Sequence, residues 1–475
     1  MLAEYRIGLS KSRYTLFCQC PKALWLKVFK PEEAVVDEAL QARFEQGNEV
    51  GDLAMGLFGS YKEVTVKNAD GSLDLNRMTE LTKQYMAEGV DNICEASFIG
   101  KGGYCAVDIL HRNGDGWDIY EVKSSTFKND KTDTDMHLLV YTRDIAYQRW
   151  LLEQCSVNVK GTYLVRLNSS YIRGKELNIK ELFHIKDMAR QVNNEYLKVL
   201  HNVSMARKVL NGSEPNEPVA IHCHEPYDCA FFHYCTKGMT APNVFNLYRM
   251  NFKRKCELYN QGKIYYKDLQ GENLTDTQQL QVETALNKTE LVTPGEISEF
   301  LKKLSYPLYF LDFETMQTAV PKYEGTRPYQ QIPFQYSLHW VEKEGGELKH
   351  SEYLGDSVSD PRRALAEQLC REMPLLAAGL GPEHGEAVFD AAPRFCGARH
   401  QRRRFRHIAK IVYEFAPCKL VVQNRVDRRG VDENVEPLRR RCAVKHLELH
   451  AEFPKRDFHR LRRAAITEKR GGFAA

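Results

Sequence analysis

The sequence predicts a mixed α/β fold, and three patterns carry that prediction. Residues 10–58 and 136–155 place apolar side chains about every 3.6 residues, which indicates amphipathic helices. Residues 90–125 instead hold three short runs rich in β-branched and aromatic residues, separated by the turns GKGG and NGDG. A second group of strands is predicted at 307–341, where PLYFLDFETM and IPFQYSLHWV are expected to be neighbours.

The remaining elements follow in order along the chain. Within the N-terminal helical region, Pro21 is expected at the first turn of a second helix, where a missing N–H costs nothing. Residues 239–304 are polar and are predicted to form a helical linker. Between the first strands and this linker we predict three elements: a helix at 136–155, a strand at 156–167 and a helix at 181–212.

The composition of the whole chain is that of a globular protein. No run approaches the ~18–20 apolar residues that a membrane helix needs, and the N-terminus lacks the apolar core of a secretory signal. We therefore expect a cytoplasmic protein that does not enter a membrane. In that compartment most of the 13 cysteines should be free, buried or bound to metal.

One constellation in the first group of strands indicates chemistry. Asp108 ends the run AVD, and Glu121 and Lys123 follow in YEVKSS. Residues i and i+2 of a strand face the same side, so Glu121 and Lys123 should point the same way. If the Asp108 strand is the hairpin neighbour, its carboxylate joins them. The alternative is an exposed cross-strand Glu–Lys pair with no function.

Two carboxylates and an ammonium suit metal-dependent hydrolysis. Carboxylate oxygens are ligands that Mg²⁺ and Mn²⁺ prefer, and such an ion can polarise a phosphodiester and activate water. A nearby lysine can orient that water or stabilise the developing charge. Asp108 and Glu121 are thus the candidate metal ligands, and Lys123 is the candidate catalytic lysine.

The pattern D-x(12)-E-V-K resembles the signature of the PD-(D/E)XK nucleases, in particular the RecB-type branch that includes CRISPR-associated iron–sulfur exonucleases. The resemblance covers roughly residues 8–238 and implies a nuclease domain at 1–238 with a restriction-endonuclease-like fold and a helical N-terminus. It also implies DNA as substrate and a site-positioning Gln148, from the helix stretch DIAYQRWLLE. One departure is that GNEVGD places Gly51 where the family often has a metal-binding His. Asp52 or Glu49 is the candidate substitute.

The stretch CHEPYDCAFFHYC at 223–235 is a second candidate site. Three interpretations remain open from the residues alone. The three cysteines and either His224 or His233 could hold zinc. They could be buried thiols without metal beside two phenylalanines. They could also be three ligands of an iron–sulfur cluster whose fourth thiolate lies elsewhere. The cysteines concerned are Cys223, Cys229 and Cys235.

The RecB-type resemblance favours the third interpretation. In its iron–sulfur members, one cysteine of the N-terminal helical region joins three cysteines after the nuclease core on a 4Fe–4S cluster. The stretch CQCPKALWL offers Cys20 as that ligand, with Cys18 as the alternative. A cluster joining Cys20 to Cys223 would hold the two ends of the domain together.

A further acidic motif opens the region 305–374. YFLDFET places Asp312 and Glu314 on one face of a hydrophobic strand, as in the first metal-binding motif of DEDD-type, RNase H-like exonucleases. The segment also resembles an uncharacterised bacterial family that joins a RecB-type domain to a domain of unknown function with LDFET. We find no later carboxylate motifs, so we predict an incomplete RNase H-like α/β domain. The alternative is two acidic residues at a sheet rim.

Residues 375–475 differ in composition from the rest. Residues 1–374 carry 45 Lys and Arg against 51 Asp and Glu, whereas the tail carries 22 against 12 and one of the 24 tyrosines. Out-of-frame reading of a GC-rich gene gives such an Arg-rich sequence, so we predict a frameshift near residues 370–380. The alternative is an authentic basic tail that binds nucleic acid through phosphates. The other reading frames of the gene separate the two interpretations. After a frameshift, another frame should encode a tyrosine-containing α/β segment with further Asp motifs, whereas an authentic tail predicts no such segment.

Two functions follow from these observations. The first is a metal-dependent DNA nuclease, an exonuclease by resemblance, with a structural 4Fe–4S cluster. The second is a non-catalytic module that binds nucleic acid or protein and keeps the nuclease scaffold. The D…E-x-K pattern and Gln148 favour the first, whereas Gly51 and the acidic balance of residues 1–374 favour the second.

Overall fold

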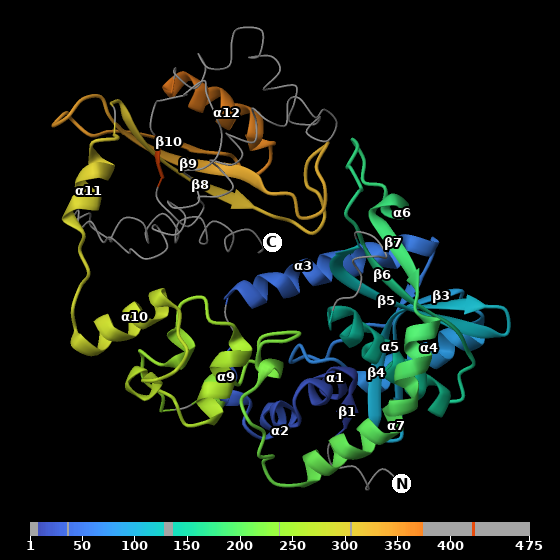
Figure 1. The fold of residues 1–475 in the computed structure, drawn as a ribbon. Helices are drawn as coiled ribbons and strands as arrows, with labels where there is room; N and C mark the ends of the chain where they lie inside the picture. The colour runs from blue at the N-terminus through green and yellow to red at the C-terminus, as the bar shows by residue number, and fades with distance from the viewer. Residues whose placement is uncertain are drawn as a thin grey trace. The chain divides into compact units, whose positions relative to one another are not determined.

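The protein has a mixed α/β fold, as the sequence predicts (Figure 1). It is seen in a computed structural model that describes residues 8–35, 38–127, 136–236, 238–304, 306–373 and 420–422. The predicted tail at 375–475 lies outside the described residues, apart from the short strand β11 (Leu420–Val422).

The first sheet has seven strands in the order β2-β3-β4-β5-β6-β7, with β1 beside β4. Strands β3, β4 and β5 form two consecutive antiparallel hairpins, and β5 runs parallel to β6. The turn between β3 and β4 has positive φ at both Lys101 and Gly102, which matches the twist of the flanking strands. The bounds are β1 (Leu9–Ser10), β2 (Lys62–Glu63), β3 (Asn92–Gly100), β4 (Gly103–Asn113), β5 (Gly116–Phe127), β6 (Val159–Asn168) and β7 (Phe183–Asp187).

Helices cover both faces of this sheet. On one face a large apolar cluster joins Ile119 of β5 to side chains of α1, α4, α5 and α7. On the other face a second cluster joins Tyr120 and Val122 to α3. The helix bounds are α1 (Lys11–Gln19), α2 (Pro21–Phe29), α3 (Glu38–Met55), α4 (Leu75–Glu88), α5 (Met136–Gln154), α6 (Ile179–Leu182) and α7 (Ala189–Asn211). Pro21 stands at the start of α2, as expected.

One predicted helix is shorter than expected. The prediction of a helix over 181–212 is wrong for its first residues, because Phe183–Asp187 forms β7 and pairs antiparallel with β6. The alternating exposure of β7 explains the difference: a half-buried edge strand satisfies these residues better than a helix would. The helix itself, α7, begins at Ala189 and ends before Gly212.

The linker has a small core of its own. Helices α9 (Phe252–Asn260) and α10 (Asp276–Asn287) contribute Leu258 and Val282 to it, and α11 (Pro294–Leu301) follows. A short helix, α8 (Phe232–Cys235), precedes this module.

The last described region holds a second sheet in the order β10-β9-β8-β11. Strands β8 (Leu308–Met316) and β9 (Ile332–Val341) pair antiparallel, as the sequence predicts. Strand β10 (Lys349–Leu354) and helix α12 (Pro361–Glu372) complete it, with α12 packing Leu365 against the sheet.

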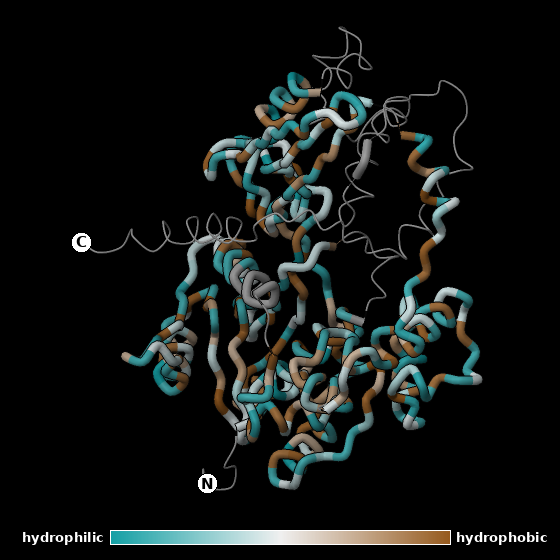
Figure 2. Tube along the Cα trace, turned by 90° about the vertical axis from the view of Figure 1, so that its left-hand side faces the viewer, coloured by the Kyte–Doolittle hydropathy of each residue, from teal (hydrophilic) through white to brown (hydrophobic). Residues whose placement is uncertain are grey.

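Two expectations from composition can be checked on the described residues. None of their helices is long and apolar enough to span a membrane, and hydrophobic stretches along the chain are short and interrupted by hydrophilic ones (Figure 2). The cysteines in the same part of the chain are all free thiols.

Candidate active site and cysteine cluster

The β4–β5 hairpin brings Asp108 and Glu121 together. Ile109 pairs with Tyr120, so the next position along the ladder sets Asp108 opposite Glu121. The backbone N–H of Val122 donates to Oδ2 of Asp108 at 2.6 Å, which fixes this carboxylate at the β5 backbone. The hairpin needed for the predicted constellation is therefore present.

Helix α5 covers the Glu121 side chain. Ile119 faces α5 and Tyr120 faces α3, so the alternation of the strand turns Glu121 towards α5. Gln148 of α5 donates from Nε2 to Oε2 of Glu121 at 2.6 Å, and both side chains are fully buried. Gln148 thus lies where the sequence places a residue that positions the site.

Lys123 reaches two carboxylates from the middle of β5. Its Nζ forms an ion pair with Glu121 and another with Oδ2 of Asp144 at 3.0 Å. Regular pairing with β6 is interrupted just after Lys123, and such bulges often re-aim side chains at active sites. The sequence prediction missed Asp144, although it stands one helical turn before Gln148 and on the same face of α5.

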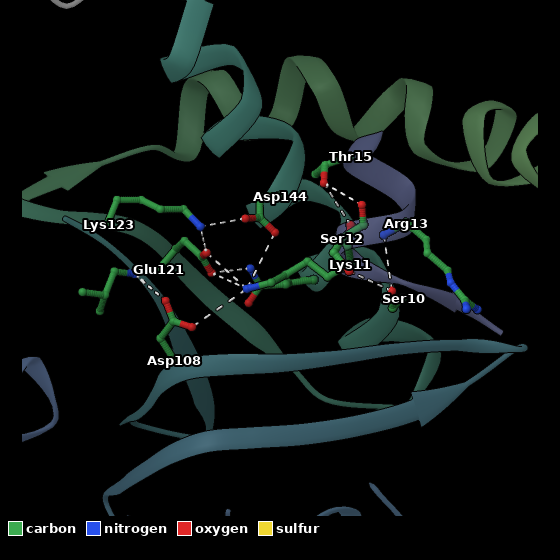
Figure 3. Close-up of polar contacts among 11 residues, drawn as sticks. Ser10, Lys11, Ser12, Arg13, Thr15, Asp108, Glu121, Lys123 and Asp144 are labelled. Carbon is green, nitrogen blue, oxygen red and sulfur yellow. Dashed lines mark hydrogen bonds and ion pairs between the residues drawn. The ribbon is translucent and has the colours of Figure 1, made fainter. Parts of the chain in front are cut away.

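A second lysine, also missed, lies among the same carboxylates. Lys11 is the first residue of α1, and its Nζ is 3.1 Å from both carboxylate oxygens of Glu121. It is also 3.9 Å from Oδ1 of Asp108 and 3.7 Å from Oδ1 of Asp144. Figure 3 shows the Lys11 side chain entering the site from α1 while the three carboxylates point towards its ammonium. No local pattern links Lys11 to residues a hundred positions later.

Glu95 is a further acidic residue beside the site. It has a φ of 54° within β3, an uncommon conformation for a non-glycine residue. The alternation of side chains between the two faces of the sheet is interrupted at Glu95. Cys94 packs in the apolar cluster on the α3 side, whereas Ile93 and Ala96, on either side of this pair, both pack in the cluster on the α5 side. Burial, followed by repulsion from Asp108, raises the pKa of Glu95 to about 7.

The electrostatics of the site separate its carboxyl groups. Burial and the Glu121 charge raise the pKa of Asp108 to about 6, and the same two causes raise the pKa of Asp144. Burial alone would raise the pKa of Glu121, but Lys11 and Lys123 hold it below its usual range. Glu121 is therefore the carboxylate that stays ionised most firmly.

The residues fit a hard divalent cation in their chemistry. Asp108, Glu121 and Asp144 supply only oxygen donors, which Mg²⁺ and Mn²⁺ prefer. The buried Oδ1 of Asp144 and Oε1 of Gln148 accept no hydrogen bond, which leaves acceptor capacity at the site. In the described part of the chain, no group of three or more His, Cys, Asp or Glu side chains is arranged to hold a metal ion, either around Glu121 or among the four cysteines.

Gly51 lies on α3, which covers the opposite sheet face from α5. A side chain at Gly51 would meet nothing within 4 Å. Glu49 and Asp52 are exposed on this helix. The contacts of Glu121 described above come from Lys11, Lys123 and Gln148, so the structure brings neither candidate substitute to it.

The four predicted cysteine ligands line one small cavity. Cys20 reaches it from the junction of α1 and α2, and Cys223, Cys229 and Cys235 reach it from the later segment. Burial raises the pKa of the Cys20 thiol to about 11, with a smaller contribution from Cys229 and Cys223. Cys18 points elsewhere, since Asn202 of α7 donates to its Sγ at 3.8 Å.

The histidines considered from the sequence do not line this cavity. His224 pairs with Asp228, and His233 is exposed. His222 does line it, and the buried Cys256 of α9 packs with Cys223 in an adjoining apolar cluster. A cavity lined by four thiols fits an iron–sulfur cluster in its donor chemistry. The sequence prediction missed both His222 and Cys256.

Asp312 and Glu314 are both exposed on β8. They face Ser337 and Gln335 across the ladder to β9, so they share one sheet face as predicted. The structure does not bring them together with the carboxylates around Glu121 in any described contact.

The connection between β8 and β9 meets the first sheet beside Lys123. The hydroxyl of Tyr329 donates to the backbone oxygen of Ser124 at 2.9 Å. Ala319 and Val320 of the same connection are buried in the apolar cluster on the α3 side. No local pattern in the sequence predicts this contact, because it joins segments about two hundred residues apart.

Comparison with known proteins adds one finding. A family model described as a domain of unknown function, DUF2779, matches residues 309–387. The matched range contains Asp312 and Glu314 but none of the residues around Glu121. No curated protein matches the chain.

Proposed function

We propose that this chain is a metal-dependent DNA nuclease of the PD-(D/E)XK type, close to the RecB branch, that hydrolyses phosphodiester bonds from a DNA end. One observation carries the proposal: Asp108, Glu121 and Lys123 converge at the middle of β5 while Gln148 holds Glu121. This grouping supports the functional interpretation over an exposed Glu–Lys pair, because Glu121 is fully buried.

Each residue has a role that its contacts support. A bound Mg²⁺ or Mn²⁺ would supply Lewis-acid polarisation of the phosphate and a more acidic water. Asp108 and Glu121 would hold this ion, with Asp144 as a third oxygen donor. Val122 N–H and Gln148 orient the first two carboxylates. Lys123 places a positive charge where it can orient the attacking water and stabilise charge on the phosphate.

We also propose that Cys20, Cys223, Cys229 and Cys235 hold a structural 4Fe–4S cluster. The shared cavity supports this proposal, as does the separation of Cys18 from it. The role would be structural, since the cluster would join the start of α2 to the segment before α9. For β8 we propose the first strand of an RNase H-like domain with Asp312 and Glu314 as metal ligands.

A nuclease assay on the full chain tests the main proposal. The protein is purified without oxygen and given end-labelled DNA with Mn²⁺. We expect hydrolysis that falls by about 10²–10³-fold in Lys123→Ala and is unchanged in Lys160→Ala, a control that removes an exposed pair with Asp115. Equal hydrolysis in wild type and Lys123→Ala would rule out the catalytic assignment.

A non-catalytic binding module is the second candidate. It is favoured by Gly51, where the family often has a metal ligand, and by the Lys11 ammonium among the carboxylates. In this case the chain would bind DNA in Mn²⁺ without cleaving it, and Lys123→Ala would leave its behaviour unchanged.

A further inference from the structure

The position of Lys11 needs an explanation beyond the proposed catalytic set. Its backbone is anchored, because Leu9 and Ser10 pair with β4 and the Ser10 side chain caps α1. From this anchor the side chain runs inward to a site where every partner of its ammonium is a carboxylate. Its Nζ is within ion-pair distance of Asp108, Glu121 and Asp144, so one ammonium is shared by three carboxylates.

The Lys11 ammonium lies where a divalent ion would have to bind. An ion shared by Asp108, Glu121 and Asp144 must lie about 2.0–2.6 Å from their oxygens. The Lys11 Nζ is already within 3.1–3.9 Å of oxygens of all three. Two cations this close would repel each other strongly in a buried site. The ammonium and the ion therefore exclude each other.

We propose that Lys11 is an internal counter-ion that occupies the cation position in the metal-free protein and must be displaced when the divalent metal binds. This inference rests on the metal site of the proposed function and adds its regulation. In the metal-free state Lys11, together with Lys123, keeps the charges of Asp108, Glu121 and Asp144 paired; unpaired carboxylates this close would repel one another. It thereby sets the metal concentration at which the site fills.

A purely structural ion pair predicts the opposite response to mutation. If Lys11 only supports the carboxylates, its removal disorders them and metal affinity falls or stays the same. If Lys11 competes with the metal, its removal takes away a rival cation and metal affinity rises. The direction of the change in affinity separates the two roles.

The test is a calorimetric titration of the full chain with MnCl₂ and no DNA. We expect Lys11→Gln to bind Mn²⁺ about tenfold more tightly than wild type, because one nearby positive charge is removed. Lys11→Arg keeps the charge and should not gain affinity. Lys160→Gln, which removes a lysine from an exposed pair, should match wild type. Unchanged or weaker binding by Lys11→Gln would overturn the inference.

A measurement on wild type covers the case in which Lys11→Gln does not fold. An amine-reactive reagent should label Lys11 slowly without metal and faster once Mn²⁺ frees its side chain, as read by mass spectrometry. No change in labelling would contradict displacement. Neither readout depends on catalysis, so failure of the nuclease assay and failure of this inference are distinguishable.

Discussion

Glu95 shows how one residue can make stability depend on pH. Its pKa is raised from 4.5 to about 7 by burial and by Asp108. Between these values the folded protein keeps a proton that the unfolded chain has lost, so the Glu95 contribution to stability falls as pH rises from about 4.5 to 7. Above that window the folded protein carries a half-buried carboxylate beside Asp108.

Glu95→Gln should remove this dependence. In metal-free buffer at pH 8 we expect the variant to melt roughly 2–4 °C above wild type, if the Glu95 charge costs about 1 kcal/mol of folding stability. At pH 4.5, where Glu95 of the folded protein is protonated, the two proteins should melt at the same temperature. Thermal unfolding followed by circular dichroism measures the difference, with the exposed Glu80→Gln as control. A constant difference at both pH values would show that Glu95 does not titrate in this window.

At the residue scale, the sequence predicted those site residues that a local pattern connects to one another. Glu121 and Lys123 share a strand face, Asp108 lies across one hairpin, and Gln148 lies on the next helix. Lys11 reaches the same site from the N-terminal helix, where no spacing could indicate it. Tertiary packing alone brings it there.

At the scale of elements, the junction of α1 and α2 decides between two neighbouring cysteines. Cys20 caps the end of α1 and the start of α2, and it faces the thiol cavity. Cys18 lies within α1 and faces Asn202 of α7. The sequence prediction put Cys20, directly before Pro21, ahead of Cys18, but the short spacing between the two cysteines does not show which side chain faces the later cysteines.

Mutation of these two cysteines tests the cluster. Cys20→Ser should lower the iron and acid-labile sulfide of anaerobically purified protein, because a thiolate ligand is lost. Cys18→Ser should keep both near wild type. Wild-type iron in Cys20→Ser would contradict the assignment, and stoichiometric zinc in the wild type would favour the zinc alternative.

Elements with a strong period were predicted well, and short edge elements were not. The hairpins of β3, β4 and β5 follow from alternation and glycine turns, and α5 follows from its helical period. The residues of strand β7 were assigned to a helix because this strand has only five residues and lies directly before α7, so its alternation could not be separated from the helical period that follows. Its pairing with β6 is a long-range contact that no local window contains.

At the scale of the whole molecule, the two sheets differ in how many candidate functional residues they carry. The first sheet, with α1 and α5, carries the carboxylates and lysines around Glu121, whereas the second carries only Asp312 and Glu314 of the predicted RNase H-like set. The DUF2779 match covers β9, β10 and nearly all of β8, but it ends at residue 387, before β11. The Arg-rich composition begins near residue 375, so the gene sequence there decides whether that domain once had its remaining motifs.

The central claim is that the carboxylate at the centre of the site serves metal-dependent DNA hydrolysis. The most direct measurement is the rate of Mn²⁺-dependent hydrolysis of end-labelled DNA by the full chain carrying Glu121→Gln. Its matched control is Asp118→Asn, which changes another buried acid of β5 that contacts Asn113 outside the site. We predict a loss of at least about 100-fold for Glu121→Gln and a near-normal rate for Asp118→Asn. Equal rates in wild type and Glu121→Gln would contradict the claim.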